Sequence, residues 1–166
     1  MQRLFFAGLL AACLLAAPPA ASADDKPAAF TSGAIRVIAP WTRATPKGAA
    51  VASGYLSVTN SGKESERLLG GASTASRRFE LHAMATIDGV MTMRELTEGL
   101  EIKPGETVEF KPGGLHIMFT GLAAPVKEGD RIKATLMFER AGAVEIEFTA
   151  AGIGAAAPAG GHEHAH

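Results

Sequence analysis

Two copies of a short histidine–methionine pattern are the residues of this sequence best suited to chemistry. The pattern is His-x-Met, at His82–Met84 and again at His116–Met118. In a β-strand, residues i and i+2 point to the same face, so each copy would present an imidazole and a thioether side by side. Met91 and Met93 repeat the same spacing. Nitrogen and sulfur donors grouped in this way predict a metal-binding site.

The donor atoms also indicate which metal would bind. Thioether sulfur is a good ligand for Cu(I) and a poor one for Zn, Mg or Ca, and no carboxylate cluster is obvious in the sequence. A blue-copper electron-transfer site needs a cysteine thiolate, but the single cysteine, Cys13, lies in a segment expected to be removed. Ser57 and Ser61 lack the elbow motif of a serine hydrolase. The sequence therefore favours a soft metal ion.

The N-terminal segment, residues 1–23, has the features of a secretory signal peptide. An apolar run over residues 4–15 is followed by Ala21–Ala23, an A-x-A cleavage signal, and no later stretch has the roughly 18 apolar residues that span a bilayer. The segment Leu10–Cys13 resembles a lipoprotein box, so lipid anchoring at Cys13 stays open as an alternative to simple cleavage. We expect an exported protein without disulfides.

The composition predicts one globular domain and argues against nucleic-acid binding. The 166 residues are 47% hydrophobic and 20% charged, and 16 Lys and Arg against 17 Asp and Glu give a formal charge of -1. A nucleic-acid binder or a polybasic membrane-surface module would carry an excess of positive charge.

Short alternating segments, separated by turn signals such as Asn60–Gly62 and Asp88–Gly89, predict an all-β fold. No long window shows the helical period. We expect a Greek-key sandwich or barrel over residues 34–150, after a loose lead-in at 24–33 and before a disordered tail at 151–166. The expected strands are residues 34–39, 54–59, 68–73, 78–84, 90–95, 107–110, 115–120, 131–138 and 144–149.

The alternation also predicts which side chains face the core. Leu81 and Ile117 would point inward. The alternate residues would then turn outward: Glu80, His82, Met84, His116 and Met118. Core methionines belong on the apolar face of a strand, so methionines on the other face support a binding site.

In these features the sequence resembles the periplasmic copper chaperones known as PCuAC. Their signature is a histidine, ten residues, a methionine, about twenty-one residues, and then His-x-Met. Here ten residues separate His82 from Met93, and twenty-two separate Met93 from His116-Ile117-Met118. The extra residue is accommodated most simply in the loop at residues 94–101, because loops tolerate insertions. The resemblance covers residues 34–150.

The resemblance implies a cupredoxin-like sandwich with one Cu(I) near the surface. The implied ligands are His82, Met93, His116 and Met118. Met84 and Met91 would be auxiliary residues, and the C-terminal histidines would form an accessory Cu(II) site: His162, His164 and His166.

We expect a monomer without enzyme activity, because transfer of copper by ligand exchange makes and breaks no bond of a substrate. The resemblance further implies a periplasmic copper carrier. It would deliver copper to the CuA centre of cytochrome c oxidase, with CuB as a further target. The recipient would be an oxidase subunit or a thiol-containing assembly protein.

Two other functions stay open from the sequence. The chain could be a periplasmic copper buffer or tolerance protein whose main site is the C-terminal tail. It could also be an exported binding sandwich that uses no metal, in which His82 and His116 are ordinary strand residues.

Overall fold

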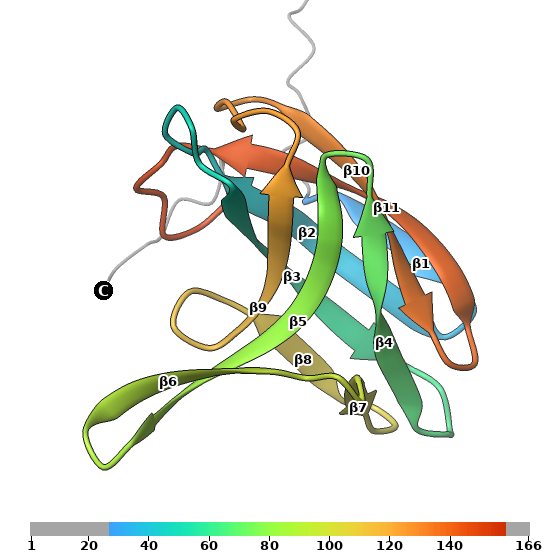
Figure 1. Ribbon diagram of the computed structural model, residues 1–166. Helices are drawn as coiled ribbons and strands as arrows, with labels where there is room; N and C mark the ends of the chain where they lie inside the picture. The colour runs from blue at the N-terminus through green and yellow to red at the C-terminus, as the bar shows by residue number, and fades with distance from the viewer. Residues whose placement is uncertain (1–26, 159–166) are drawn as a thin grey trace, which may run out of the picture.

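The computed structural model describes residues 27–158, which form eleven strands and no helix (Figure 1). The prediction of an all-β fold is therefore confirmed. The expected signal peptide and residues 159–166 of the tail lie outside the described part of the chain. The strands are β1 (Ala29–Ser32), β2 (Ile35–Arg43), β3 (Val51–Asn60), β4 (Glu66–Ser73), β5 (Ser76–Ile87), β6 (Val90–Glu95), β7 (Leu100–Ile102), β8 (Thr107–Phe110), β9 (Leu115–Leu122), β10 (Arg131–Phe138) and β11 (Gly142–Ala151).

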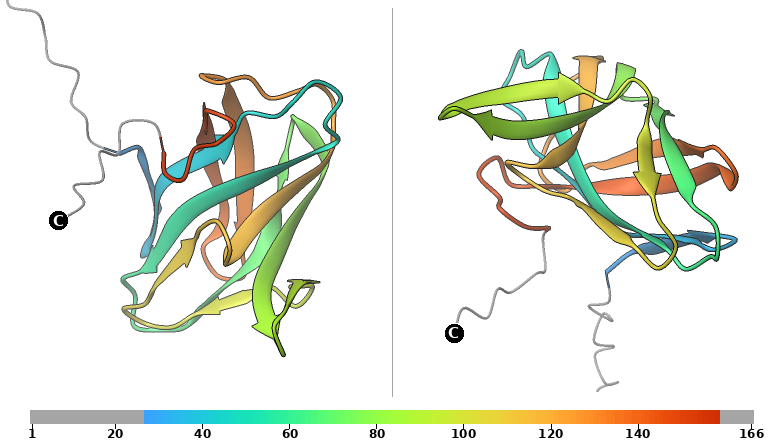
Figure 2. Two further views of the ribbon diagram at one scale, coloured as in Figure 1. Left: turned by 90° about the vertical axis from the view of Figure 1, so that its left-hand side faces the viewer. Right: turned by 90° about the horizontal axis from the view of Figure 1, so that it is seen from below.

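The strands form one mixed sheet that curls until its two parts face each other (Figure 2). The order along the sheet is β6-β5-β9-β8-β3-β2-β11-β10-β4-β7, with β1 paired to β2. Most neighbours are antiparallel, whereas β11 pairs with β2 and β8 pairs with β9 in parallel. The hairpin of β5 and β6 extends from the body as a long arm at one end of this order (Figure 1).

The core lies between the facing parts of the sheet. Phe119 of β9 is fully buried, and its ring meets Phe79 of β5 and Phe148 of β11 edge to face, at centroid distances of 5.4 and 5.3 Å. A Cβ atom at Gly54 of β3 would lie 2.8 Å from the Phe119 ring, so only glycine lets β3 pass so close to it. Aromatic packing thus holds β5, β9 and β11 together.

Two strands were not predicted from the sequence, and both are short. β1 lies in the segment expected to be a loose lead-in, and it forms only because it pairs with β2. β7 has three residues, which are too few for an alternating pattern to be recognised, and it pairs with the start of β4.

The packed domain also extends beyond residue 150, into the segment expected to be tail. β11 ends at Ala151, and Ala155 packs against the buried pair Trp41 and Tyr55. The Nε of Arg43 donates a hydrogen bond to the Ala155 carbonyl at 2.7 Å. These contacts anchor the chain as far as Ala155, although the composition of this segment is that of a linker.

No helix of the described residues is long and apolar enough to cross a bilayer.

Glu66, at the start of β4, is a buried carboxylate that binds the turn between β10 and β11. Its Oε1 accepts hydrogen bonds from the backbone N–H of Arg67 and Arg140 at 2.8 and 2.9 Å, and its Oε2 accepts one from Ala141 at 2.8 Å. Burial by itself would raise the pKa of Glu66. The three N–H groups and the nearby Arg140 charge outweigh burial, so the pKa is lowered.

We expect Glu66→Gln to reduce the free energy of unfolding at pH 7 by about 1–3 kcal/mol, because its amide NH₂ would face backbone N–H donors. The folded-state pKa is lowered, so the wild-type advantage is present above about pH 4.5 and is lost as the pH falls through the folded-state value. Urea unfolding of both proteins at neutral and acidic pH measures this. Equal stability at pH 7 would contradict the role given to Glu66.

Candidate metal centre

Three neighbouring strands, β6, β5 and β9, bring the predicted ligands to one face of the sheet. The pairing places them opposite one another: His82 with His116, Met84 with Met93, and Glu80 with Met118. Side chains that are directly opposite in an antiparallel pair lie on the same face, with their Cβ atoms about 4.5–5.5 Å apart. Met93 and Met118 are therefore diagonal neighbours of His82, one toward each end of the strand, within reach of a long side chain.

The two histidines are buried, which corrects the expectation that they turn outward to solvent. They lie on the face opposite Leu81 and Ile117, as alternation predicts, but only 8% of His82 and 5% of His116 is exposed. The two imidazoles lie beside each other, with ring centroids 5.6 Å apart and planes inclined at 40°, so each ring shields part of the other. Both histidines are therefore buried even though they lie on the strand face that turns away from the main core.

The methionines form a gradient from buried to exposed side chains. Met84 and Met118 are half-buried, beside the histidines. Met91 and Met93, on the protruding arm of β5 and β6, are 67% and 51% exposed (Figure 1). An ion arriving from solvent would therefore meet a thioether before it reached an imidazole.

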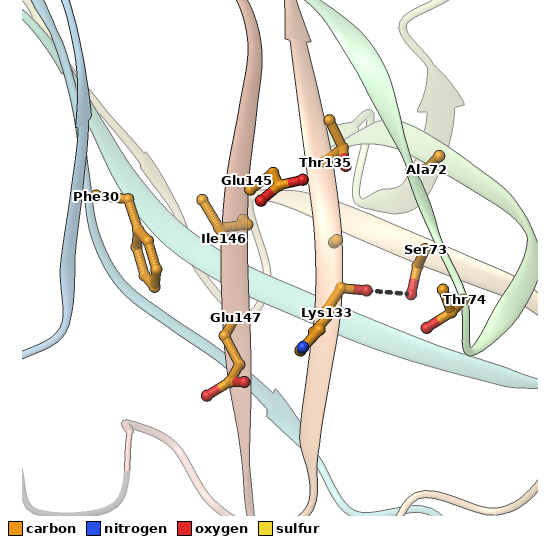
Figure 3. Close-up of a pocket in the computed structure, with 10 residues that line it drawn as sticks. Phe30, Ala72, Ser73, Thr74, Lys133, Thr135, Glu145, Ile146 and Glu147 are labelled. Atoms are coloured by element: carbon orange, nitrogen blue, oxygen red, sulfur yellow. Dashed lines mark hydrogen bonds between the residues drawn. The ribbon is translucent and has the colours of Figure 1, made fainter.

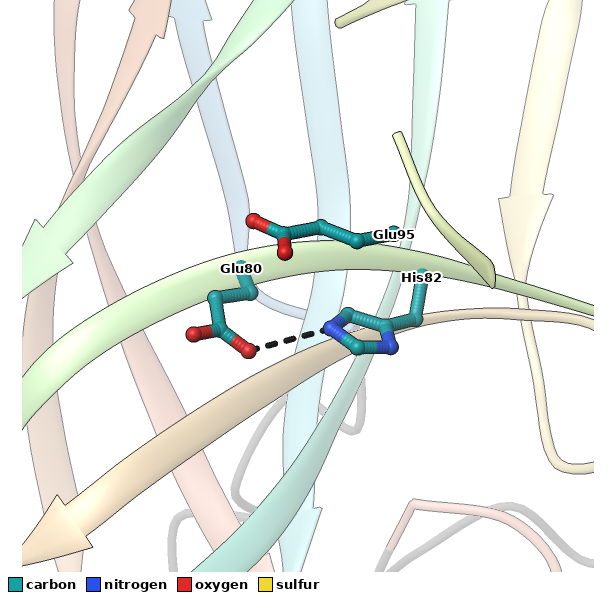
Figure 4. A group of neighbouring side chains, drawn as sticks. All are labelled: Glu80, His82 and Glu95. Carbon is teal, nitrogen blue, oxygen red and sulfur yellow. Dashed lines mark hydrogen bonds and ion pairs between the residues drawn. The ribbon is translucent and has the colours of Figure 1, made fainter. Parts of the chain in front are cut away.

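The hydrogen bonds of the histidines leave one ring nitrogen of each free. Nδ1 of His116 donates to the Gly114 carbonyl at 3.1 Å, so its Nε2 carries the lone pair. Nε2 of His82 lies 3.0 Å from Oε2 of Glu80 (Figure 4). Nδ1 of His82 is one of two buried side-chain polar atoms that have no partner among the described residues, the other being Oγ1 of Thr120. An unpartnered ring nitrogen beside imidazole and thioether donors fits a soft metal ion such as Cu(I).

Two carboxylates also lie beside His82, although no carboxylate cluster is obvious in the sequence. The ligand atoms of Glu80, His82 and Glu95 lie within 4.8 Å of one another, and Arg78 forms an ion pair with Glu80 at 2.6 Å. Glu80 could have been identified from the sequence, because it is two residues before His82 and so on the same face. Glu95 could also have been identified, because the two-residue turn at Asp88–Gly89 pairs residue 87 with residue 90 and so places Glu95 opposite His82.

A groove of about 710 Å³ lies elsewhere on the sheet and contains none of these residues (Figure 3). Side chains of β4, β10 and β11 line it together with Phe30 of β1, and Ser73 donates a hydrogen bond to the Lys133 carbonyl within it. It has no histidine or methionine, so it offers no soft donor. The histidines of the tail, His162, His164 and His166, lie outside the described residues.

Comparison with known proteins finds similar chains whose descriptions concern lipoproteins or copper. Residues 35–150 match the family described as "Putative lipoprotein LpqE-like". The "Putative lipoprotein Lxx21020" of Leifsonia xyli subsp. xyli is 34% identical over 129 residues, which is 78% of this chain and 74% of that protein.

Solved structures with the same fold include the apo PCuAC domain of PmoF2, with 27% identity and a TM-score of 0.66, covering 78% of this chain and 99% of that one. The copper-bound PCuAC domain of PmoF2 is also 27% identical, with a TM-score of 0.64, covering 75% of this chain and 98% of that one.

Proposed function

Because this chain belongs to the LpqE-like lipoprotein family and is homologous to copper-binding PCuAC domains, we propose that it is a periplasmic carrier holding one Cu(I) through four residues: His82, Met93, His116 and Met118. The observation that carries the proposal is the pairing of His82 with His116 across β5 and β9. Two imidazoles that face each other, with one free ring nitrogen each, form the nitrogen half of a Cu(I) site.

Copper is the cargo of this protein, and its neutral ligands suit release as well as binding. Imidazole and thioether add no negative charge to the ion, so a partner with thiolate ligands would bind Cu(I) more strongly. The exposed Met93 is the ligand that a partner can displace first, and the buried histidines would release the ion last. Transfer would be ligand exchange, with no bond of a substrate made or broken, so we propose no enzymatic step.

The recipient that we propose is the CuA centre of cytochrome c oxidase, reached directly or through a thiol-containing assembly protein. CuB is the further target. The arm of β5 and β6, which carries the ligand Met93 and the neighbouring Met91, is the part of the molecule most accessible to such a partner. The family is described as a lipoprotein family, which gives weight to anchoring at Cys13 as the alternative to cleavage after Ala23. Mass spectrometry of the exported protein distinguishes the two.

Substitution of Met93 tests the sulfur half of the site. We expect Met93→Leu to weaken Cu(I) binding by more than about tenfold. Removal of a residue that only hydrogen-bonds to a metal ligand already weakens metal binding by about 10–100-fold, so loss of a ligand itself should cost at least the lower value. Met91→Leu is the matched control, because Met91 is also an exposed methionine, lies on the same strand face two residues away, and is not one of the four proposed ligands. The measurement is an anaerobic competition titration against a chromophoric Cu(I) chelator. Equal losses in the two variants would remove Met93 from the proposed ligands.

The two alternative functions predict different results in the same titration. A copper buffer that uses the tail would lose its one tightly bound Cu(I) per chain (the tight equivalent) when residues 159–166 are removed. The proposed carrier would keep it. An exported sandwich that uses no metal would show no tight equivalent in either form.

A further inference from the structure

The two histidines of the proposed site are held through opposite ring nitrogens. His116 uses Nδ1, which lies 3.1 Å from the Gly114 carbonyl, and His82 uses Nε2, which lies 3.0 Å from Oε2 of Glu80. A carbonyl or a carboxylate oxygen can only accept a hydrogen bond, so each of these ring nitrogens carries the hydrogen. The lone pair is therefore on Nε2 in His116 and on Nδ1 in His82.

The Nδ1 atom of His82 is the one that lacks a partner. It is buried, and no polar group of the described residues contacts it. Figure 4 shows it on the side of the ring that faces away from Glu80 and Glu95. A buried acceptor without a donor is unfavourable in the free protein, and a bound cation would remove that cost.

Glu80 is itself fixed in place, which makes it able to orient His82. Its side chain is only 11% exposed, and Arg78 binds the second carboxylate oxygen at 2.6 Å. One oxygen thus faces Arg78 and the other faces His82. A carboxylate that accepts the N–H of a metal-ligating histidine fixes the tautomer and the ring orientation and makes the imidazole a stronger donor.

We propose that Cu(I) is bound by Nδ1 of His82 together with Nε2 of His116, and that Glu80, held by Arg78, is the positioning residue that selects Nδ1. This inference depends on the proposed function, because it assigns atoms within the same site. It adds two residues, Glu80 and Arg78, that do not touch the ion and yet determine how His82 meets it.

The competing arrangement is an ion bound between Glu80, His82 and Glu95. Their ligand atoms are within 4.8 Å of one another, and a cavity of about 290 Å³ borders both glutamates. That arrangement requires a lone pair on Nε2 of His82. The structure disfavours it, because Nε2 is directed at a carboxylate oxygen and Arg78 already neutralises Glu80.

Nitrogen NMR of the full exported chain distinguishes the two arrangements. Cu(I) is a closed-shell ion, so long-range ¹H–¹⁵N spectra of ¹⁵N-labelled histidine can be recorded with and without it. We expect the free protein to show His82 with its hydrogen on Nε2. Loading with Cu(I) should then shift Nδ1 of His82 and Nε2 of His116. A shift that locates the metal at Nε2 of His82 would overturn the inference.

A pair of variants tests the role of Glu80, with Glu95 as the matched control. In Glu80→Gln the single amide oxygen would pair with Arg78 and the NH₂ would face His82, which moves the ring hydrogen to Nδ1 and blocks it. We expect Cu(I) binding to weaken by about 10–100-fold, as for other outer-shell partners of histidine ligands. Glu95→Gln removes the same charge near His82 but leaves the hydrogen bond between Glu80 and His82 intact. Its Cu(I) affinity should therefore stay within about threefold of wild type, well below the 10–100-fold loss expected for Glu80→Gln.

The possible failures are distinguishable. Wild-type affinity in Glu80→Gln, or a His82 hydrogen on Nδ1 in the free protein, overturns the positioning role while leaving copper carriage intact. Absence of a tight Cu(I) equivalent in the wild-type chain removes the proposed function, and the inference with it. Thermal unfolding of each variant shows whether the domain is still folded. A variant that unfolds at the wild-type temperature but has a changed histidine spectrum has lost the orientation of His82 and not its fold.

Discussion

Replacement of both His82 and His116 by alanine is expected to abolish tight Cu(I) binding. The two rings face each other across β5 and β9, and each has one nitrogen free for a metal. Of the four proposed ligands, only the thioethers of Met93 and Met118 would then remain. Loss of an outer-shell partner weakens metal binding by about 10–100-fold, so loss of two ligands should exceed the upper end of that range. The anaerobic chelator competition described above measures the change.

The matched control removes the same number of histidines from the tail, as His164→Ala with His166→Ala. It should keep the tight equivalent, because these residues are outside the proposed site. If the tail variant loses the tight equivalent and the His82→Ala, His116→Ala protein retains it, the copper-buffer alternative replaces the proposed carrier. Thermal unfolding of both proteins in the absence of copper shows whether the buried substitutions leave the domain folded.

Truncation of Phe119 is expected to have the largest effect on stability. Its side chain is fully buried, and it joins Phe79 and Phe148 at the centre of the core. Phe119→Ala should reduce the free energy of unfolding by about 3–5 kcal/mol, since it removes a large apolar side chain and leaves a cavity. Total stabilities are typically about 5–15 kcal/mol, so this loss brings the domain close to unfolding. Urea denaturation measures it.

Phe30→Ala is the matched control, because Phe30 is only partly buried, on the short strand β1 at the margin of the core. Its cost should be clearly smaller than that of Phe119→Ala. Phe119 also follows Met118, the proposed ligand on the opposite face of β9. The proposed site exists only in the folded chain, so Cu(I) should raise the unfolding midpoint of Phe119→Ala if that site survives the substitution. If Phe119→Ala reduced the free energy of unfolding by less than about 1 kcal/mol, the aromatic contacts would not be what holds the two parts of the sheet together.

Much of the fold was predictable because strand alternation and turn chemistry are local properties. All nine expected strands are present, and the predicted hairpin turn at Asp88–Gly89 is present as well. The resemblance to PCuAC and the cupredoxin-like all-β fold were confirmed by solved structures of such domains. β1 and β7 were missed because each exists only through its pairing partner.

The sequence by itself determined which side chains share a strand face, because the spacing of two residues places His82 with Met84 and His116 with Met118 whatever surrounds them. Only the tertiary structure decided that β5 and β9 pair so that His82 lies opposite His116. That register joins strands more than thirty residues apart in the sequence, and it depends on how the core around Phe119 packs. The burial of the two histidines and the unpartnered Nδ1 of His82 likewise depend on neighbours that are brought together only by folding.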